Sequence, residues 1–332
     1  MKRVDNIYER MISMENLELA DKNARRGKTS KYGVRKHDRH REENLRRLHE
    51  TLVRGEYHTS PYQTQVIYEP KERLIYKLPY YPDRIMHHAI MNVLEPIWVS
   101  GFTRDTYANI KGRGIHKCVE AIKQALYKDP KGTEYCLKID IRKYYPSIDH
   151  DVMKREVRRK IKDERVLALL DEIIESEKGL PIGNYLSQYF ANVYLNRFDH
   201  RMKEVYKVKH YYRYVDDMVF LAGTKEELRQ MLEVVKTELV ALKLELKDNW
   251  QIFPVDKRGI DFLGYKFYHG YTLLRKSVKK RIFKRIGQYN RDEIKDETFE
   301  RSMASWHGWL MWADTYRLTI KINNTIKERK AT

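Results

Sequence analysis

Two adjacent aspartates, Asp216 and Asp217, are the residues of this sequence best suited to chemistry. They end the tetrapeptide Tyr-Val-Asp-Asp, which begins at Tyr214 and has aromatic and aliphatic residues on both sides. Two such runs with a short polar break predict a β-hairpin that carries both carboxylates at its tip. Neighbouring carboxylates repel each other, and Mg²⁺, which prefers oxygen ligands, would relieve that repulsion. Aspartate is also common in turns for conformational reasons alone, so the pair needs a third carboxylate.

Asp140 is the candidate for the third carboxylate. The run 135–141 alternates, with Tyr135, Leu137, Ile139 and Ile141 on one face and Cys136, Lys138 and Asp140 on the other. Such a strand, paired with the acidic hairpin, would bring three carboxylates together. Two metal ions held by them can stabilise both the attacking and the leaving oxygen of a phosphoryl displacement. The alternative is that Asp140 merely starts a turn.

Composition indicates a polyanionic partner. The 332 residues carry a net charge of +19, with 66 Lys and Arg, and 25 tyrosines stand among them. Such a balance favours nucleic acid first and an anionic membrane surface second. Aromatic side chains among basic residues suit base stacking, although most of the tyrosines are expected in the core. The two cysteines, Cys118 and Cys136, have no zinc-site spacing.

The sequence shows no signal for a membrane. It contains no run of about 18 apolar residues, the length that a spanning helix needs. The N-terminus is basic but has no apolar core after it, unlike a secretory signal. The expected setting is cytoplasmic.

The first 90 residues predict helices followed by a hairpin. Residues 1–60 are helical and basic, and the cluster 25–31 reads as a loop that is either solvated surface or a phosphate contact. Residues 62–81 predict a hairpin, with Lys71 and Arg73 near its turn. A helix is expected from residue 83. Its adjacent histidines, 87 and 88, face different ways and are a poor metal pair.

Residues 135–267 predict an antiparallel sheet covered by helices. The expected order is a strand at 135–141, helical segments at 152–177 and 187–197, the acidic hairpin, a helix with a capping box at Thr224, and a strand at 262–267. This order is close to a split βαβ unit. A further helical segment follows, with apolar residues at helical spacing.

These features together resemble a reverse transcriptase. The family's palm motifs match Asp140, Gly183, the stretch 214–217, and Leu263-Gly264-Tyr265. The resemblance implies an α+β right-hand polymerase with an antiparallel, ferredoxin-like palm sheet. We expect a basic helical extension at 1–60, fingers with part of the palm at 61–134, a palm at 135–268 and a helical thumb at 269–332.

The resemblance also implies roles for residues. Asp140, Asp216 and Asp217, helped by the carbonyl of Ile141, would hold two Mg²⁺ ions. The nucleotide site would comprise Lys71 and Arg73 on the triphosphate, Tyr145 as the steric gate against ribose, and Ile182, Gly183 and Gln188. Leu263, Gly264 and Tyr265 would form the primer grip. The substrates would be deoxynucleotides and an RNA template, with an RNA–DNA duplex against the thumb.

One departure indicates a subfamily. Most members near the group II intron branch carry Gln-Gly-x-x-x-Ser-Pro at the helix entry, whereas this chain has Ile182 in place of Gln and Gln188 in place of Pro. This pattern, and the tail 305–315, resemble the enzymes of diversity-generating retroelements. That resemblance implies mutagenic retrohoming, in which a template-repeat RNA is copied with errors opposite adenine. It also implies a small, basic, ring-forming accessory protein.

Other interpretations remain open. A group II intron protein usually carries a DNA-binding or nuclease extension beyond the thumb. The sequence signatures of a retron enzyme are not found. An RNA-dependent RNA polymerase more often has Gly before the paired aspartates. A non-catalytic nucleic-acid binder of the same fold is the alternative from another class, and the intact set of three acids argues against it.

Overall fold

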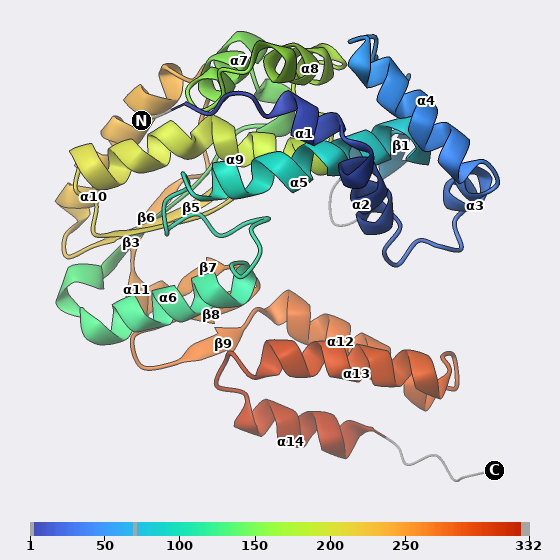
Figure 1. The fold of residues 1–332 in the computed structure, drawn as a ribbon. Helices are drawn as coiled ribbons and strands as arrows, with labels where there is room; N and C mark the ends of the chain where they lie inside the picture. Colours follow the sequence, from blue (N-terminus) through green and yellow to red (C-terminus); the bar gives the residue numbers. More distant parts are fainter. Residues whose placement is uncertain (1–2, 69–71, 327–332) are drawn as a thin grey trace. The chain divides into compact units, whose positions relative to one another are not determined.

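The computed structural model describes residues 3–68 and 72–326, which form two compact units interleaved along the chain (Figure 1). Unit 1 takes the described parts of Met1–Asn109, Ile141–Val208 and Val235–Lys247. Unit 2 takes Ile110–Asp140, Lys209–Val234 and the described part of Asp248–Thr332. Helix α10 (Lys225–Val240) runs from one unit into the other.

Unit 1 is mainly helical. Its helices are α1 (Tyr8–Ile12), α2 (Met14–Ala24), α3 (Tyr32–Asp38), α4 (Arg41–Val53), α5 (Ile85–Val99), α7 (His150–Arg158), α8 (Glu164–Glu175) and α9 (Tyr185–His200). Helix α5 is apolar on nearly all sides, and α1, α2 and α9 pack against it. A helix that is apolar all round must be buried, which makes α5 the centre of this unit.

The predicted N-terminal elements are confirmed. Leu45, Leu48 and Leu52 form the buried face of α4. Residues 25–31 form the turns between α2 and α3. Strands β1 (Gln63–Ile67) and β2 (Arg73–Lys77) pair antiparallel as the expected hairpin. A kinked turn, η1 (Tyr80–Arg84), in which the backbone of Tyr81 is extended, leads into α5.

The helical segment predicted at 152–177 is two helices. Helices α7 and α8 are separated by residues 159–163. Asp149 caps α7 by accepting from the backbone N–H of Val152 at 3.0 Å. Asp163 caps α8 in the same way, and its other carboxylate oxygen accepts from the backbone N–H of Ile7 at 2.7 Å. An N-cap residue has non-helical backbone angles, so the chain is interrupted at Asp163 and a new helix starts after it.

Unit 2 is built on a four-stranded antiparallel sheet. Its strand order is β4-β5-β3-β6, formed by β4 (His210–Tyr214), β5 (Asp217–Ala222), β3 (Tyr135–Asp140) and β6 (Gln251–Pro254). Helix α6 (Ile115–Lys128) packs on β4. Cys136 is completely buried although it shares a strand face with Lys138 and Asp140, so only the end of that face near the acid is open.

The prediction of a last strand at residues 262–267 is wrong in two respects. Residues 262–267 are a hairpin, not one strand, because β7 (Ile260–Phe262) and β8 (Tyr265–Phe267) flank a two-residue turn. They form a second sheet with β9 (Thr272–Leu274). The fourth strand of the first sheet is β6, a short run that follows the polar stretch 247–249 and ends in proline. The alternating pattern of a strand is hard to detect over four residues.

The C-terminal segment of unit 2 is helical as expected. Its helices are α12 (Lys276–Asn290), α13 (Asp296–Leu310) and α14 (Tyr316–Thr325), drawn in orange to red in Figure 1. Tyr289 of α12 stacks on Phe299 of α13 with ring centroids 3.8 Å apart. Phe283 of α12 and Met231 of α10 are only partly buried. None of the described helices has the length and apolar character needed to cross a bilayer.

Candidate catalytic site

Strand pairing in unit 2 brings the paired aspartates to Asp140. In the β3–β5 ladder, Asp140 lies directly opposite Asp217. In the β4–β5 ladder, Tyr214 lies opposite Asp217, which leaves Val215 and Asp216 as the turn. Directly opposite residues in an antiparallel pair have Cβ atoms about 5 Å apart. The strand that ends at Asp140 therefore pairs with the acidic hairpin, as predicted, and the pairing places Asp140 opposite Asp217.

A buried arginine supports this turn. Val215 has a φ of +58°, which is a strained conformation for a β-branched residue. The Arg213 side chain, which is fully buried, donates from Nη1 to the Val215 carbonyl at 3.0 Å. The sequence showed Arg213 only as a charged residue within an apolar strand, and that placement was the signal that could have identified it.

The electrostatics of Asp217 favour a cation. Burial raises the pKa of Asp217 to about 6; Lys138 acts against this shift, while the charges of Asp140 and Asp216 add to it. Lys138 Nζ lies 3.8 Å from Asp217 Oδ1. That oxygen is buried and accepts no hydrogen bond from the described residues. A buried carboxylate oxygen without a donor is costly, and coordination of a cation would offset the cost.

The carboxylates of Asp140, Asp216 and Asp217 are ligands of the type that Mg²⁺ prefers, since it binds through carboxylates and water. As the side chains stand, no group of three His, Cys, Asp or Glu within the described residues has the geometry to hold a metal ion. Magnesium at these aspartates therefore stays a prediction. Ile141, the predicted carbonyl ligand, is buried and forms a bridge with Leu246 in unit 1.

The predicted nucleotide-binding residues that are described all belong to unit 1. Lys71 lies outside the described residues. Arg73 begins β2 and is exposed, opposite Ile67. Tyr145 begins a short 3-10 turn, is half-buried, and packs edge-on against Tyr144 at 5.8 Å. Its backbone carbonyl accepts from the N–H of Leu180 at 2.8 Å.

The entry to α9 is bound to the hairpin strand β2. The backbone N–H of Tyr76 donates to the carbonyl of Ile182 at 2.8 Å. Gly183 has a φ of +120°, and a Cβ there would lie 2.5 Å from the Tyr76 carbonyl oxygen. Only glycine fits such a close backbone approach. Ile182 is half-buried, while Gln188 is exposed on α9.

The predicted primer grip is the tip of the β7–β8 hairpin. Leu263 and Gly264 have φ values of +50° and +84°, typical of a two-residue turn with both residues left-handed. Tyr265 is buried, and its ring stacks on Trp309 with centroids 5.4 Å apart. Burial raises the pKa of Tyr265 to about 12, and its hydroxyl donates to the Trp309 carbonyl at 3.1 Å. Within this motif Gly264 and Tyr265 are buried, and only Leu263 is partly exposed.

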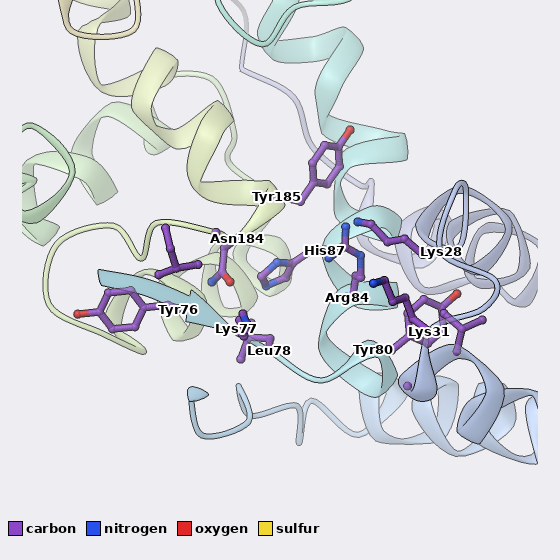
Figure 2. Close-up of a pocket in the computed structure, with 14 residues that line it drawn as sticks. Lys28, Lys31, Tyr76, Lys77, Leu78, Tyr80, Arg84, His87, Asn184 and Tyr185 are labelled. Atoms are coloured by element: carbon purple, nitrogen blue, oxygen red, sulfur yellow. The ribbon is translucent and has the colours of Figure 1, made fainter. Parts of the chain in front are cut away.

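Sequence reasoning missed a cavity of about 470 Å³ in unit 1 (Figure 2). Its lining comes from four separate parts of the chain, and includes Lys28, Lys31, Arg84 and His87. The basic cluster at 25–31 was the only signal in the sequence.

Comparison with known proteins extends the match beyond the motifs. Residues 69–267, more than half of the chain, match the family model of the reverse transcriptase, an RNA-dependent DNA polymerase. Protein YkfC of Escherichia coli is 26% identical over 271 residues, covering 67% of this chain and 70% of YkfC. The group II intron-encoded protein LtrA of Lactococcus lactis is 21% identical over 300 residues, covering 68% of this chain.

Among solved structures, apo telomerase from Candida tropicalis shares the fold, with a TM-score of 0.50 at 11% identity over 64% of this chain. The chain spans about half the length of two of these proteins, 49% of LtrA and 48% of the telomerase chain. The family model, the relatives and the fold agree, and the chain belongs to the reverse transcriptase family of RNA-dependent DNA polymerases.

Proposed function

We propose that this chain extends a DNA primer on an RNA template by nucleotidyl transfer at Asp140, Asp216 and Asp217. Strand register carries the proposal, because Asp140 and Asp217 are opposite partners and Asp216 lies in the adjoining turn. These carboxylates would hold Mg²⁺, which would lower the pKa of the primer 3′-hydroxyl and neutralise charge on the transferred phosphate. The raised pKa of Asp217 supports this role, since a carboxylate that resists ionisation gains most from a neighbouring cation.

The other predicted residues have roles in positioning. Lys71 and Arg73 hold the triphosphate, since Arg offers a bidentate fork and Lys a point charge. The ring of Tyr145 excludes a ribose 2′-hydroxyl, which selects deoxynucleotides. The carbonyl of Ile141 adds an oxygen ligand, and the turn at Leu263 and Gly264 steadies the primer. The N-terminal extension comprises residues 1–60, the fingers with part of the palm 61–134, the palm 135–268 and the thumb 269–332.

Replacing Asp216 with alanine tests the chemistry. Primer extension on an RNA template with deoxynucleotides and Mg²⁺ should fall by about 10³-fold, as when one electrostatic stabiliser of a transition state is removed. Asp151→Ala, at an exposed position of α7, is the matched control and should retain activity. If Asp216→Ala extends primers as well as the control does, the chain is a binder and not a polymerase.

We further propose that the enzyme serves a diversity-generating retroelement and copies a template-repeat RNA with errors opposite adenine, together with a small basic accessory protein. The support is the departure at the α9 entry. The Ile182 backbone is bonded to β2, while its half-buried side chain has no polar group. An apolar side chain cannot hydrogen-bond a nucleotide, so correct and incorrect pairs are discriminated less well. A lost contact of about 1 kcal/mol changes selectivity several-fold.

The variant Ile182→Gln tests this step. Sequencing of cDNA made with the accessory protein present should show misincorporation opposite adenine reduced several-fold, because the amide restores a polar contact. Val53→Gln, an exposed position on α4, is the control and should leave the error spectrum unchanged. Equal error rates in Ile182→Gln and the unmodified chain would contradict the proposal that the missing polar contact at Ile182 causes the errors.

A group II intron-type reverse transcriptase is the second candidate, favoured by the similarity to the intron-encoded protein LtrA. The same sequencing assay separates the two. An enzyme of that type is expected to copy adenines as accurately as other bases, with or without an accessory protein.

A further inference from the structure

A second cavity of unit 1 lies where three helices meet. Helix α9 packs against both α5 and α7 (Figure 1). The cavity between them is lined by residues from the end of α5, the end of α7 and the second half of α9. Its volume is about 310 Å³, at the lower end of the range for small-ligand sites, roughly 300–1,000 Å³. No residue of its lining is among the catalytic, nucleotide-site or primer-grip residues predicted from the sequence.

The apolar part of this lining is aromatic and buried. Trp98 and Phe102 are 3% and 7% exposed. The Trp98 ring packs on Phe190 of α9 with centroids 5.8 Å apart, so its position is fixed from behind. Val193 of the same helix also lines the cavity. Aromatic side chains pack well against flat rings, so these walls suit a ligand with a planar apolar body.

Three buried polar atoms of the lining have no hydrogen-bond partner among the residues that the structure describes. They are Nε1 of Trp98, Oε1 of Glu156 and Oδ1 of Asn196. Ten side-chain atoms of this kind occur in the described parts of the chain, and three of them belong to this one cavity. Buried polar groups without a partner are rare and call for a ligand, an ion or ordered water. Their concentration here indicates an occupant with hydrogen-bonding groups of its own.

The ion pairs around the cavity leave the Glu156 oxygen open. Oε2 of Glu156, which is 4% exposed, lies 2.9 Å from Nε of Arg159. Oε1 lies 3.6 Å from Nε of Arg155, which is too far for a hydrogen bond. The other acid of the lining, Glu204, lies 2.7 Å from Nδ1 of His200. Oε1 of Glu156 is therefore the carboxylate oxygen that an occupant reaches.

The three open atoms select the chemistry of the occupant. An anion brings lone pairs, which repel the Glu156 carboxylate. A cation brings only donors and leaves the Trp98 N–H without an acceptor. It would also meet the cations Arg159, Lys160 and Arg197 of the same lining. A primary carboxamide carries two N–H donors and one carbonyl acceptor, and so matches the two open acceptors and the one open donor.

We propose that this cavity binds a small, neutral, aromatic carboxamide. The amide nitrogen of the ligand donates to Glu156 Oε1 and Asn196 Oδ1, and its carbonyl accepts from Trp98 Nε1. Its ring packs against Phe102 and Val193. All these residues belong to unit 1, and the inference does not depend on nucleotidyl transfer.

The test uses three probes of nearly equal size and shape. Benzamide is neutral, benzoate is an anion and benzamidine is a cation. The Trp98 indole N–H signal, identified by its absence in Trp98→Phe, is followed in ¹H–¹⁵N spectra of the full chain with EDTA present and no nucleotide. Benzamide should shift this signal until it saturates. Benzoate and benzamidine should bind at least about tenfold more weakly, since each leaves a buried group unsatisfied.

A variant tests the polar contact at Asn196. Asn196→Leu removes an open acceptor at a half-buried position and keeps a side chain of similar size. It should bind benzamide about tenfold more weakly than the unmodified chain, because one hydrogen bond is lost. Asn323→Leu, at an exposed position of α14 outside the cavity, is the matched control and should bind benzamide as the unmodified chain does.

The proposal is overturned if benzamide leaves the Trp98 signal unmoved, because ordered water alone would then satisfy the three atoms. Equal affinities for the three probes also overturn it, since the cavity would then recognise only an apolar ring. Both results come from the unmodified chain, so they stand even if Asn196→Leu does not fold. A folded Asn196→Leu that binds benzamide as well as Asn323→Leu would equally contradict the assigned contact. None of these measurements uses primer extension, so their outcome is separate from that of Asp216→Ala.

Discussion

At the scale of residues, the acidic hairpin combines three unfavourable features. Asp217 holds a buried oxygen without a donor, its neighbours Asp140 and Asp216 are also acids, and Val215 is left-handed. Strained backbone and repelling charges persist only where the surroundings over-determine them, and they concentrate at functional sites. Arg213, which donates a hydrogen bond to the Val215 carbonyl, stabilises this arrangement.

Arg213→Met should therefore impair catalysis through the metal site. Without the bond to Val215 the turn relaxes, and the Mg²⁺ concentration for half-maximal primer extension should rise several-fold, as when a group that orients metal ligands is lost. Arg213→Lys, which keeps the charge and loses the fork, should recover part of the effect. Arg229→Met on α10 is an exposed control. A lower melting temperature with unaltered Mg²⁺ dependence would limit Arg213 to a structural role.

At the scale of elements, tight turns determine where functional residues are presented. The predicted strand at 262–267 contains the β7–β8 turn, because Leu263 and Gly264 both adopt positive φ. Gly264 is pressed against Trp309, where a Cβ would lie 2.6 Å from the indole ring. This contact ties the hairpin to α13, both within unit 2. The glycine is therefore needed for packing as well as for turn geometry.

Gly264→Ala should destabilise the protein markedly. Overpacking typically costs about 1–3 kcal/mol, and a left-handed non-glycine residue adds about 1–2 kcal/mol. Thermal unfolding is the measurement, with Gly270→Ala as control, since a Cβ at Gly270 meets nothing within 4 Å. Equal melting temperatures for the two variants would mean that Trp309 moves aside without cost.

At the scale of the whole molecule, the family match at residues 69–267 includes parts of both units. The three aspartates belong to unit 2, whereas Arg73, Tyr145, Ile182 and the cationic cavity belong to unit 1. The net charge of +19 is distributed over a chain that must bind a polyanion. Part of that charge is concentrated in the cavity, where it is partly desolvated and therefore interacts more strongly.

The sequence by itself determined the features that depend on residues close together along the chain. Alternation identified β3, and the Tyr-Val-Asp-Asp motif identified the hairpin. The family, and with it the enzyme class, followed from these motifs taken together. Each pattern spans only a few residues, so local rules sufficed to recognise it.

Only the tertiary structure decided what depends on distant segments. It replaced the expected last strand of the first sheet with β6, separated α7 from α8 at Asp163, and assembled a cavity from residues as far apart as Lys28 and Asn184. Strand partners and cavity walls are selected by packing between remote parts of the chain. That selection leaves no periodic signal in the sequence, because each segment alone is compatible with several partners.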